Sequence, residues 1–182
     1  MGVAILPKDV KLFSAIMFHD ENVLDQVKAT LTELWGPIEV ESAIFDFTHS
    51  DYYLAEMGAD LKKQFIVFLK MVPPDFLVAA KLITNEIEQK HLKNGRRQVN
   101  LDPGYISAAK VVLATTKDYV HRIYLGRGIY GDVHLKSSKR QLVPNEWTYP
   151  DYKMPQTIAF FDKVRKDYLE LIANQSKTLS EK

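Results

Sequence analysis

The sequence predicts an α+β fold in which an antiparallel or mixed sheet carries helices packed mainly on one face. Two short runs, residues 11–18 and 65–69, are almost entirely apolar, as is typical of strands at the centre of a sheet. Two longer stretches, 23–34 and 76–87, repeat apolar residues at helical spacing. With one further strand between the first helix and the second apolar run and another after the second helix, these runs predict a ferredoxin-like βαββαβ core.

The first elements are bounded by clear end signals. The strand at 11–18 is followed by Asp20, whose side chain is suited to cap the N-terminus of a helix. Gly36 and Pro37 end that helix, because glycine adopts the left-handed conformation common after a last turn and proline cannot continue the helix. Residues 38–47 then alternate well enough to predict a second strand.

The predicted core is completed by a buried strand, a second helix and a short final strand. The run Phe-Ile-Val-Phe-Leu at 65–69 is the clearest buried strand of the chain. Pro73-Pro74-Asp75 is suited to open the next helix, which we expect to end near Asn94-Gly95. A short strand at 98–101 would complete the βαββαβ unit.

The C-terminal half is predicted to extend this core by a hairpin and a helix. Pro103-Gly104 is typical of a turn, and residues 106–116 predict a short helix with its alanines and Val112 facing inward. The other predicted elements are strands at 120–125 and 129–135 joined across Gly126-Arg127-Gly128, a weaker strand at 141–145, and an amphipathic helix at 158–172.

The composition indicates one globular domain of the cell interior. A chain of 182 residues with 46% apolar residues is suited to a single domain, predicted over 1–175 and followed by a disordered tail at 176–182. The chain has no cysteine, which excludes disulfides, thiolate zinc sites, iron–sulfur clusters and a cysteine nucleophile. No stretch approaches the roughly 18 apolar residues that cross a membrane. We therefore expect a cytoplasmic protein without a membrane partner.

The charge is balanced overall but uneven along the chain. The formal net charge is +1, so nothing attracts the whole protein to nucleic acid. Residues 96–140 hold nine Lys or Arg and three Asp, a net charge of +6, and include five of the six arginines. Arginine is well suited to hold carboxylates and phosphates. The alternative is a solvated basic face, and no RNA-binding motif accompanies the segment, which argues against a nucleic-acid partner.

Motifs for nucleotides and nucleophilic catalysis are absent or incomplete. There is no phosphate-binding loop of the Walker type. Gly126-Arg127-Gly128 lacks the third glycine of a dinucleotide motif and lies in a predicted hairpin. Thr116-Lys117-Asp118 places its acid one residue too close for the guanine-reading element of GTPases. No serine occupies a strand-to-helix nucleophile elbow.

The histidines do not predict a metal site. None has the i, i+4 spacing of a zinc protease. His121 and His134 lie on adjacent predicted strands, where Asp102 or Asp132 could add an oxygen, but a strand histidine is more often a half-buried polar residue. The residues identify no cofactor.

Tyrosine, aspartate, histidine and arginine concentrate in a few segments that predict a ligand site. Guanidinium groups hold an anion while aromatic rings stack on a flat part, so the expected ligand is small and phosphorylated or carboxylated, with a nucleotide among the candidates. Asp102 and His121 are the predicted catalytic residues, because either can transfer a proton in a cleft; whether the protein is an enzyme stays open. The predicted ligand-binding residues are Tyr105, Lys117, Arg122, Tyr124, Arg127, Tyr130 and Trp147.

Two other interpretations of these segments stand beside the ligand site. In the first, the tyrosines cap the core with their hydroxyls in water and the arginines pair with acids. In the second, the chain is a protein-interaction module, with self-association among its modes. The Asp51-Tyr52-Tyr53 and 147–152 loops would then form the contact patch, because Tyr, Trp and Arg are enriched at interface hot spots.

Several long motifs resemble those of a small bacterial family of unknown function. The resemblance covers about 10–171, and it implies no established activity, cofactor or catalytic residue. Members are often labelled "GTP-binding protein", a label that the phosphate-loop and guanine-reading patterns do not support here. The motifs are Phe45-x-Phe47-Thr48-x-x-Asp51-Tyr52-Tyr53-x-x-Glu56-Met57-Gly58, Asn100-Leu101-Asp102-Pro103-Gly104-Tyr105, Ala114-Thr115-Thr116-Lys117-Asp118, the segment His121 to Tyr130 (HRIYLGRGIY), and Trp147-Thr148-Tyr149-Pro150-Asp151-Tyr152.

Overall fold

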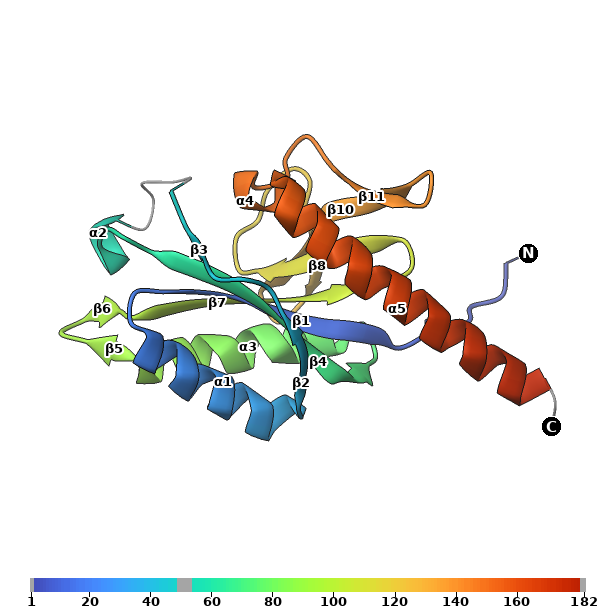
Figure 1. Ribbon diagram of the computed structural model, residues 1–182, viewed down its shortest axis with the longest axis horizontal. Coiled ribbons are helices and arrows are strands. Elements are labelled where there is room, and N and C mark those ends of the chain that lie inside the picture. The colour runs from blue at the N-terminus through green and yellow to red at the C-terminus, as the bar shows by residue number, and fades with distance from the viewer. Residues whose placement is uncertain (1, 49–53, 181–182) are drawn as a thin grey trace.

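A computed structural model of the chain describes residues 2–48 and 54–180 (Figure 1). Its helices are α1 (Glu21–Trp35), α2 (Leu54–Met57), α3 (Phe76–Lys90), α4 (Pro150–Lys153) and α5 (Pro155–Ser180). Its strands are β1 (Val10–Phe18), β2 (Ile38–Glu41), β3 (Phe45–Asp46), β4 (Lys62–Val72), β5 (Leu92–Lys93), β6 (Arg96–Arg97), β7 (Val99–Ile106), β8 (Lys110–Thr115), β9 (Ile123–Gly126), β10 (Ile129–Ser138) and β11 (Gln141–Pro144).

The described residues form one large sheet and a separate small hairpin. The sheet has nine strands in the order β11-β10-β8-β7-β1-β4-β2, with β3 also paired to β4 and β9 to β10. Every strand pair in it is antiparallel. The neighbours β7-β1-β4-β2 are the four strands of the predicted ferredoxin-like unit. The α+β fold class is therefore confirmed.

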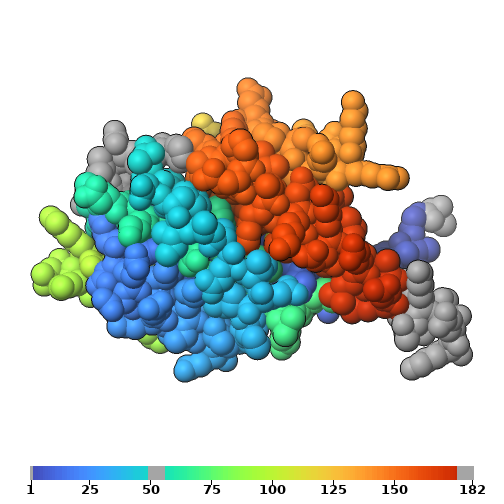
Figure 2. All heavy atoms as spheres, viewed as in Figure 1, coloured from blue at the N-terminus to red at the C-terminus, as the bar shows by residue number. Residues whose placement is uncertain are grey.

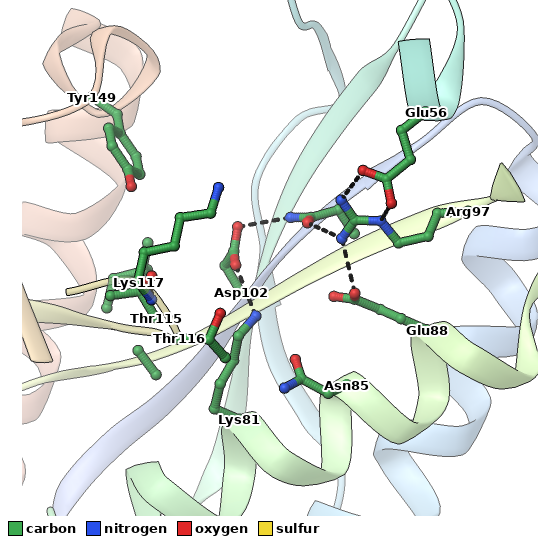
Figure 3. A pocket seen from close by; sticks show the side chains of 13 residues that line it. Glu56, Lys81, Asn85, Glu88, Arg97, Asp102, Thr115, Thr116, Lys117 and Tyr149 are labelled. Atoms are coloured by element: carbon green, nitrogen blue, oxygen red, sulfur yellow. Dashed lines mark hydrogen bonds and ion pairs between the residues drawn. The ribbon is translucent and has the colours of Figure 1, made fainter. Parts of the chain in front are cut away.

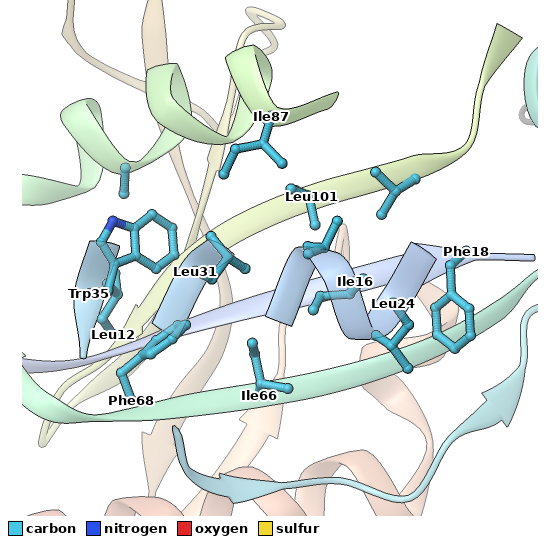
Figure 4. Close-up of a cluster of buried hydrophobic side chains, with 13 residues drawn as sticks. Leu12, Ile16, Phe18, Leu24, Leu31, Trp35, Ile66, Phe68, Ile87 and Leu101 are labelled. Atoms are coloured by element: carbon cyan, nitrogen blue, oxygen red, sulfur yellow. The ribbon is translucent and has the colours of Figure 1, made fainter. Parts of the chain in front are cut away.

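Helices α1 and α3 cover one face of this unit and bury its first core. Asp20 caps α1 as predicted, its side chain accepting a hydrogen bond from Asn22 N at 2.9 Å. Figure 4 shows side chains from both helices and from β1, β4 and β7 meeting in one layer. Leu31 of α1 is fully buried there, and Trp35 lies edge-on to Phe68 with ring centroids 5.1 Å apart.

Helix α5 packs on the opposite face, a position that the sequence did not indicate. Phe13 of β1, Phe65 of β4, and Tyr152 and Phe161 of the C-terminal helices pack in a second buried cluster. Helices therefore lie on both faces of the sheet, with α1 and α3 on one and α5 on the other (Figure 1). In the space-filling view α5, orange to red, runs along the surface next to the cyan segment that joins β2 to β3 (Figure 2).

Two sequence predictions in the middle of the chain are wrong. The predicted helix at 106–116 is the end of β7 and the strand β8, whose residues Val111 to Ala114 are buried between β7 and β10. Pro103-Gly104 is not a turn but part of β7, where Gly104 pairs with Phe13 of β1. Gly104 is needed there for close approach, because a Cβ atom would meet Phe13 Cζ at 2.3 Å.

Smaller differences concern the ends of elements. Helix α3 ends at Lys90, and Asn94-Gly95, predicted at its end, instead forms the turn between β5 and β6, with both residues at positive φ. The strand predicted at 120–125 begins only at Ile123. The division into a domain at 1–175 and a disordered tail stays a prediction; the backbone of α5 extends to Ser180. No helix within the described ranges is long and apolar enough to cross a membrane.

Candidate functional site

The site lies where the sheet opens between β7 and β8. These strands pair only from Gly104 to Ile106 and from Val111 to Leu113. Before Gly104, β7 continues along β1, whereas beyond Leu113 β8 continues along β10. The gap between them holds a polar pocket with a volume of about 370 Å³ (Figure 3). We call it the gap pocket.

Side chains of α3 satisfy the backbone of β7 that β8 leaves unpaired. The amide of Leu101 donates to Glu88 Oε1 at 2.7 Å, and its carbonyl accepts from Lys81 Nζ at 2.8 Å. Lys81 and Glu88 lie seven residues apart, two helical turns, so they share one side of α3. Both side chains are buried. Their charged groups supply the hydrogen bonds that a neighbouring strand would otherwise make to the backbone of Leu101.

A chain of polar contacts crosses the floor of the gap pocket. Lys81 Nζ lies 3.0 Å from Asp102 Oδ1, and Asn100 Nδ2 donates to Asp102 Oδ2 at 2.7 Å. The amide oxygen of Asn100 in turn accepts from the guanidinium of Arg97 at 2.9 Å. Each oxygen of the Asp102 carboxylate thus has one fixed donor and keeps capacity for a further hydrogen bond.

Arg97 joins three acidic or amide side chains at the far end of the pocket. It binds both oxygens of Glu56 at 2.6 Å and Glu88 Oε2 at 3.0 Å. Burial alone would lower the pKa of Arg97, but these two carboxylates raise it above its ordinary value. Burial raises the pKa of Glu88, although the charge of Lys81 opposes this. The guanidinium is therefore a permanent charge at this end.

Asp102 stays ionised despite its position. Burial would raise its pKa, but the charges of Lys81 and Lys63 and the hydrogen bonds from Lys81 and Asn100 together lower the pKa below its ordinary value. The group is consequently a hydrogen-bond acceptor at neutral pH.

The opposite wall comes from the end of β8 and from Tyr149, which directly precedes α4. Thr115, Thr116 and Lys117 follow one another there (Figure 3). Arg122 NH2 donates to the hydroxyl of Tyr149 at 2.9 Å, and Arg122 NH1 donates to the carbonyl of Lys117 at 2.9 Å. One guanidinium therefore ties both parts of this wall together.

Behind this wall lies a group of two histidines and an aspartate, of which His134 and Asp132 are buried. Asp132 Oδ2 accepts from Arg122 Nε at 2.9 Å and lies 3.3 Å from His121 Nε2 and 3.7 Å from His134 Nε2. His134 is fully buried, and burial lowers its pKa to about 4, against the opposing charge of Asp132. Trp147 stacks on His121 with ring centroids 5.0 Å apart. No group of three acids or histidines within the described ranges is placed to hold a metal ion.

The sequence-predicted site residues fall into several places. Asp102 and Lys117 line the gap pocket. His121, Arg122 and Trp147 belong to the network behind its wall. The other four lie elsewhere: Tyr105 and Arg127 line a separate, mostly apolar depression of about 690 Å³ beside Pro73 and Pro74, and Tyr124 and Tyr130 pack against each other with ring centroids 5.3 Å apart. Asp51-Tyr52-Tyr53 lies outside the described residues.

Sequence reasoning missed much of the gap pocket. Lys81 and Glu88 belong to the polar positions of a predicted amphipathic helix, which are normally solvated. The sequence places Arg97 only within the basic segment and Tyr149 only within a motif. The available signal was the alternation of Asn100 and Asp102 on β7, which places both on one face of that strand.

The fold and site define an α+β protein with a ferredoxin-like core, an extended antiparallel sheet, and a charged pocket where that sheet opens. Residues 8–168 match the family model described as "Domain of unknown function (DUF4416)". The chain therefore belongs to that family, and the resemblance found in its motifs is confirmed. Neither a curated protein nor a solved structure matches the chain.

Proposed function

We propose that the protein binds a small polar ligand carrying a phosphate or carboxylate group in the gap pocket. The observation that supports this most is the convergence of Lys81, Arg97 and Lys117 on one pocket of about 370 Å³. Surface charges are usually dispersed, whereas here buried side chains from α3 and β7 are held by fixed hydrogen bonds. Such preorganised polar groups are typical of ligand sites.

We assign the anionic end of the ligand to Lys117, because an ammonium group has three donors and can hold a ligand beside its other contacts. Lys81 and Arg97 are less exposed, and they hold the carboxylates of Asp102, Glu56 and Glu88. Lys117 is exposed, lines the pocket, and lies near enough to Glu56 to lower the pKa of that carboxyl, after the larger effect of Arg97. The sequence contains no phosphate-binding loop of the Walker type. GTP binding therefore receives no support beyond the family label.

In this proposal Asp102 is the acceptor, and the base if the protein is an enzyme. Its carboxylate is ionised and faces the same pocket as Lys117. His121 is the other predicted proton-transfer residue. It contacts Asp132 and stacks on Trp147, so it belongs to the network behind the wall and not to the pocket lining.

Ligand binding is tested by thermal unfolding and calorimetry with inorganic phosphate, sugar phosphates and small carboxylic acids. At 100 times its dissociation constant a ligand adds about 2.7 kcal/mol to stability, which raises the midpoint by several degrees. Lys117→Gln is expected to weaken binding by at least about tenfold, since it removes a charge-assisted contact of about 1.5–3 kcal/mol.

The matched control is Lys136→Gln, an exposed lysine on β10 outside the pocket, which should bind as the original chain does. Equal affinity of both variants would contradict the proposed position of the anion. The absence of any binding across the panel would contradict the ligand function itself.

A second candidate function, self-association, is supported by the edge of the sheet at β9. This short strand pairs with β10 on one side and has no strand partner on the other within the described ranges. Its residues carry no charge, Ile123 and Tyr124 are 68% and 60% exposed, and the preceding Val120 is 95% exposed. Uncharged apolar edge strands tend to pair with another chain.

We expect a concentration-dependent dimer in sedimentation or light scattering, which Ile123→Lys should convert to a monomer. The control is Leu34→Lys, a similarly exposed leucine on α1 that lies away from the edge. A strict monomer at all concentrations would dismiss this function.

A further inference from the structure

We infer that the ligand of the gap pocket carries an acid group at one end and a hydroxyl or ammonium group at the other, as amino acids and hydroxy acids do, and that Tyr149 donates a hydrogen bond to the acid. This inference rests on the proposed function, because it assigns the substrate class of the same pocket. Tyr149 is a residue that the sequence did not single out as a ligand-binding group.

The hydroxyl of Tyr149 has a fixed position. Its ring packs against the ring of His134, with centroids 4.4 Å apart, and its oxygen lies 2.9 Å from Arg122 NH2. Arg122 is itself held at two further points, by Asp132 Oδ2 and by the carbonyl of Lys117, each at 2.9 Å. The side chain of Arg122 is only 9% exposed, so its position is fixed and it fixes the position of the Tyr149 hydroxyl in turn.

The direction of these hydrogen bonds makes Tyr149 a donor toward the pocket. A guanidinium can only donate, so the oxygen of Tyr149 accepts from Arg122. The hydroxyl proton of Tyr149 then points away from Arg122, and no acceptor for it occurs among the described residues. Figure 3 shows the hydroxyl of Tyr149 and the ammonium group of Lys117 both directed into the pocket. One wall thus offers a neutral and a charged donor, a pairing suited to the two oxygens of a carboxylate.

The facing wall offers the opposite chemistry. Asp102 is an ionised acceptor whose two oxygens are each oriented by one donor, Lys81 or Asn100. A ligand with only an acid group would offer this carboxylate no hydrogen-bond donor. A hydroxyl or an ammonium group on the ligand supplies the missing donor, so the pocket selects for two functions on one small molecule.

Matched probes test this substrate class. Each amino acid of a small-molecule set is compared with the hydroxy acid and the plain carboxylic acid of the same carbon skeleton, and with the amine that lacks the carboxyl group. One such set is alanine, lactate, propionate and ethylamine. At least one amino or hydroxy acid is expected to bind at least about tenfold more tightly than both of its one-function counterparts, and the preferred member decides between ammonium and hydroxyl.

The outcomes separate the two proposals. Equal binding of plain acids or inorganic phosphate would overturn the substrate class and leave the anion site intact. Binding of no probe of either kind would overturn both.

The role of Tyr149 is tested by Tyr149→Phe, which keeps the ring against His134 and removes only the hydroxyl. The variant should bind the preferred acid at least about fivefold more weakly and bind the plain amine unchanged. Its unfolding midpoint without ligand should fall only slightly, because the hydrogen bond lost from Arg122 is solvent-exposed. Tyr124→Phe serves as the control, because among the described residues its hydroxyl accepts a hydrogen bond from Gly128 N alone, at 3.4 Å. Unchanged affinity of Tyr149→Phe for every acid would overturn the donor role.

Discussion

Replacing Lys63 with methionine is expected to lower the free energy of unfolding by about 3–5 kcal/mol. Lys63 Nζ lies 2.5 Å from Asp151 Oδ2, and the two side chains are only 8% and 2% exposed. The rings of Phe47, Phe65 and Tyr152 surround the ammonium group at 5.2–5.5 Å. Methionine fills a similar volume but leaves the charge of Asp151 buried without a partner. Urea denaturation at neutral pH measures the loss.

The adjacent residue provides a matched control for this prediction. Lys62 also forms an ion pair, with Glu21 at 2.8 Å, but both side chains are exposed, so Lys62→Met should change stability far less. The double variant Lys63→Met with Asp151→Asn should recover much of the loss, because it removes the unpartnered charge. A double variant as unstable as Lys63→Met alone would show that packing, not charge pairing, is the contribution of Lys63.

The second large effect concerns His134 and acid stability. Its pKa is about 4 in the folded protein because the ring is buried, against an ordinary value of 6.5. Between pH 6.5 and 4 the unfolded chain takes up a proton that the folded chain refuses, so stability falls as the pH is lowered through this window. The difference corresponds to about 3 kcal/mol, lost by pH 4.

The measurement compares the original chain with His134→Asn by denaturation at a series of pH values. Asparagine can retain the acceptor that His134 Nδ1 offers to Tyr149 N at 3.4 Å, and it does not titrate. Glu88 has the opposite effect on the pH dependence, because its raised pKa stabilises the folded protein as the pH falls. The lowered pKa of Asp102 means that its contribution to stability is lost only below this pH window. The informative quantity is therefore the difference in the free energy of unfolding between the two proteins at each pH. If this free energy falls equally in both as the pH is lowered, the assignment to His134 is contradicted.

Local pattern was sufficient for the core of the fold. The apolar runs of β1 and β4 and the helical periodicity of α1 and α3 are properties of short segments, so their order alone predicted the ferredoxin-like unit. The prediction of a helix at 106–116 is wrong because it also depended on local pattern alone. The buried run Val111 to Ala114 has neither strand alternation nor enough length to identify a helix, and its pairing with β7 and β10 decides the structure.

Some residues of the site could likewise be found from local sequence, and others only from the tertiary structure. The sequence by itself determined the fold class and the family, and it singled out two residues that line the pocket, Asp102 and Lys117, because their charged groups lie in segments dense in polar and aromatic residues. Only the tertiary structure decided that Lys81 and Glu88 face a gap between strands, since a helix pattern does not tell which polar side meets the sheet. It also decided that Arg122 holds Tyr149, 27 residues away, because such contacts depend on how distant strands diverge rather than on any local spacing.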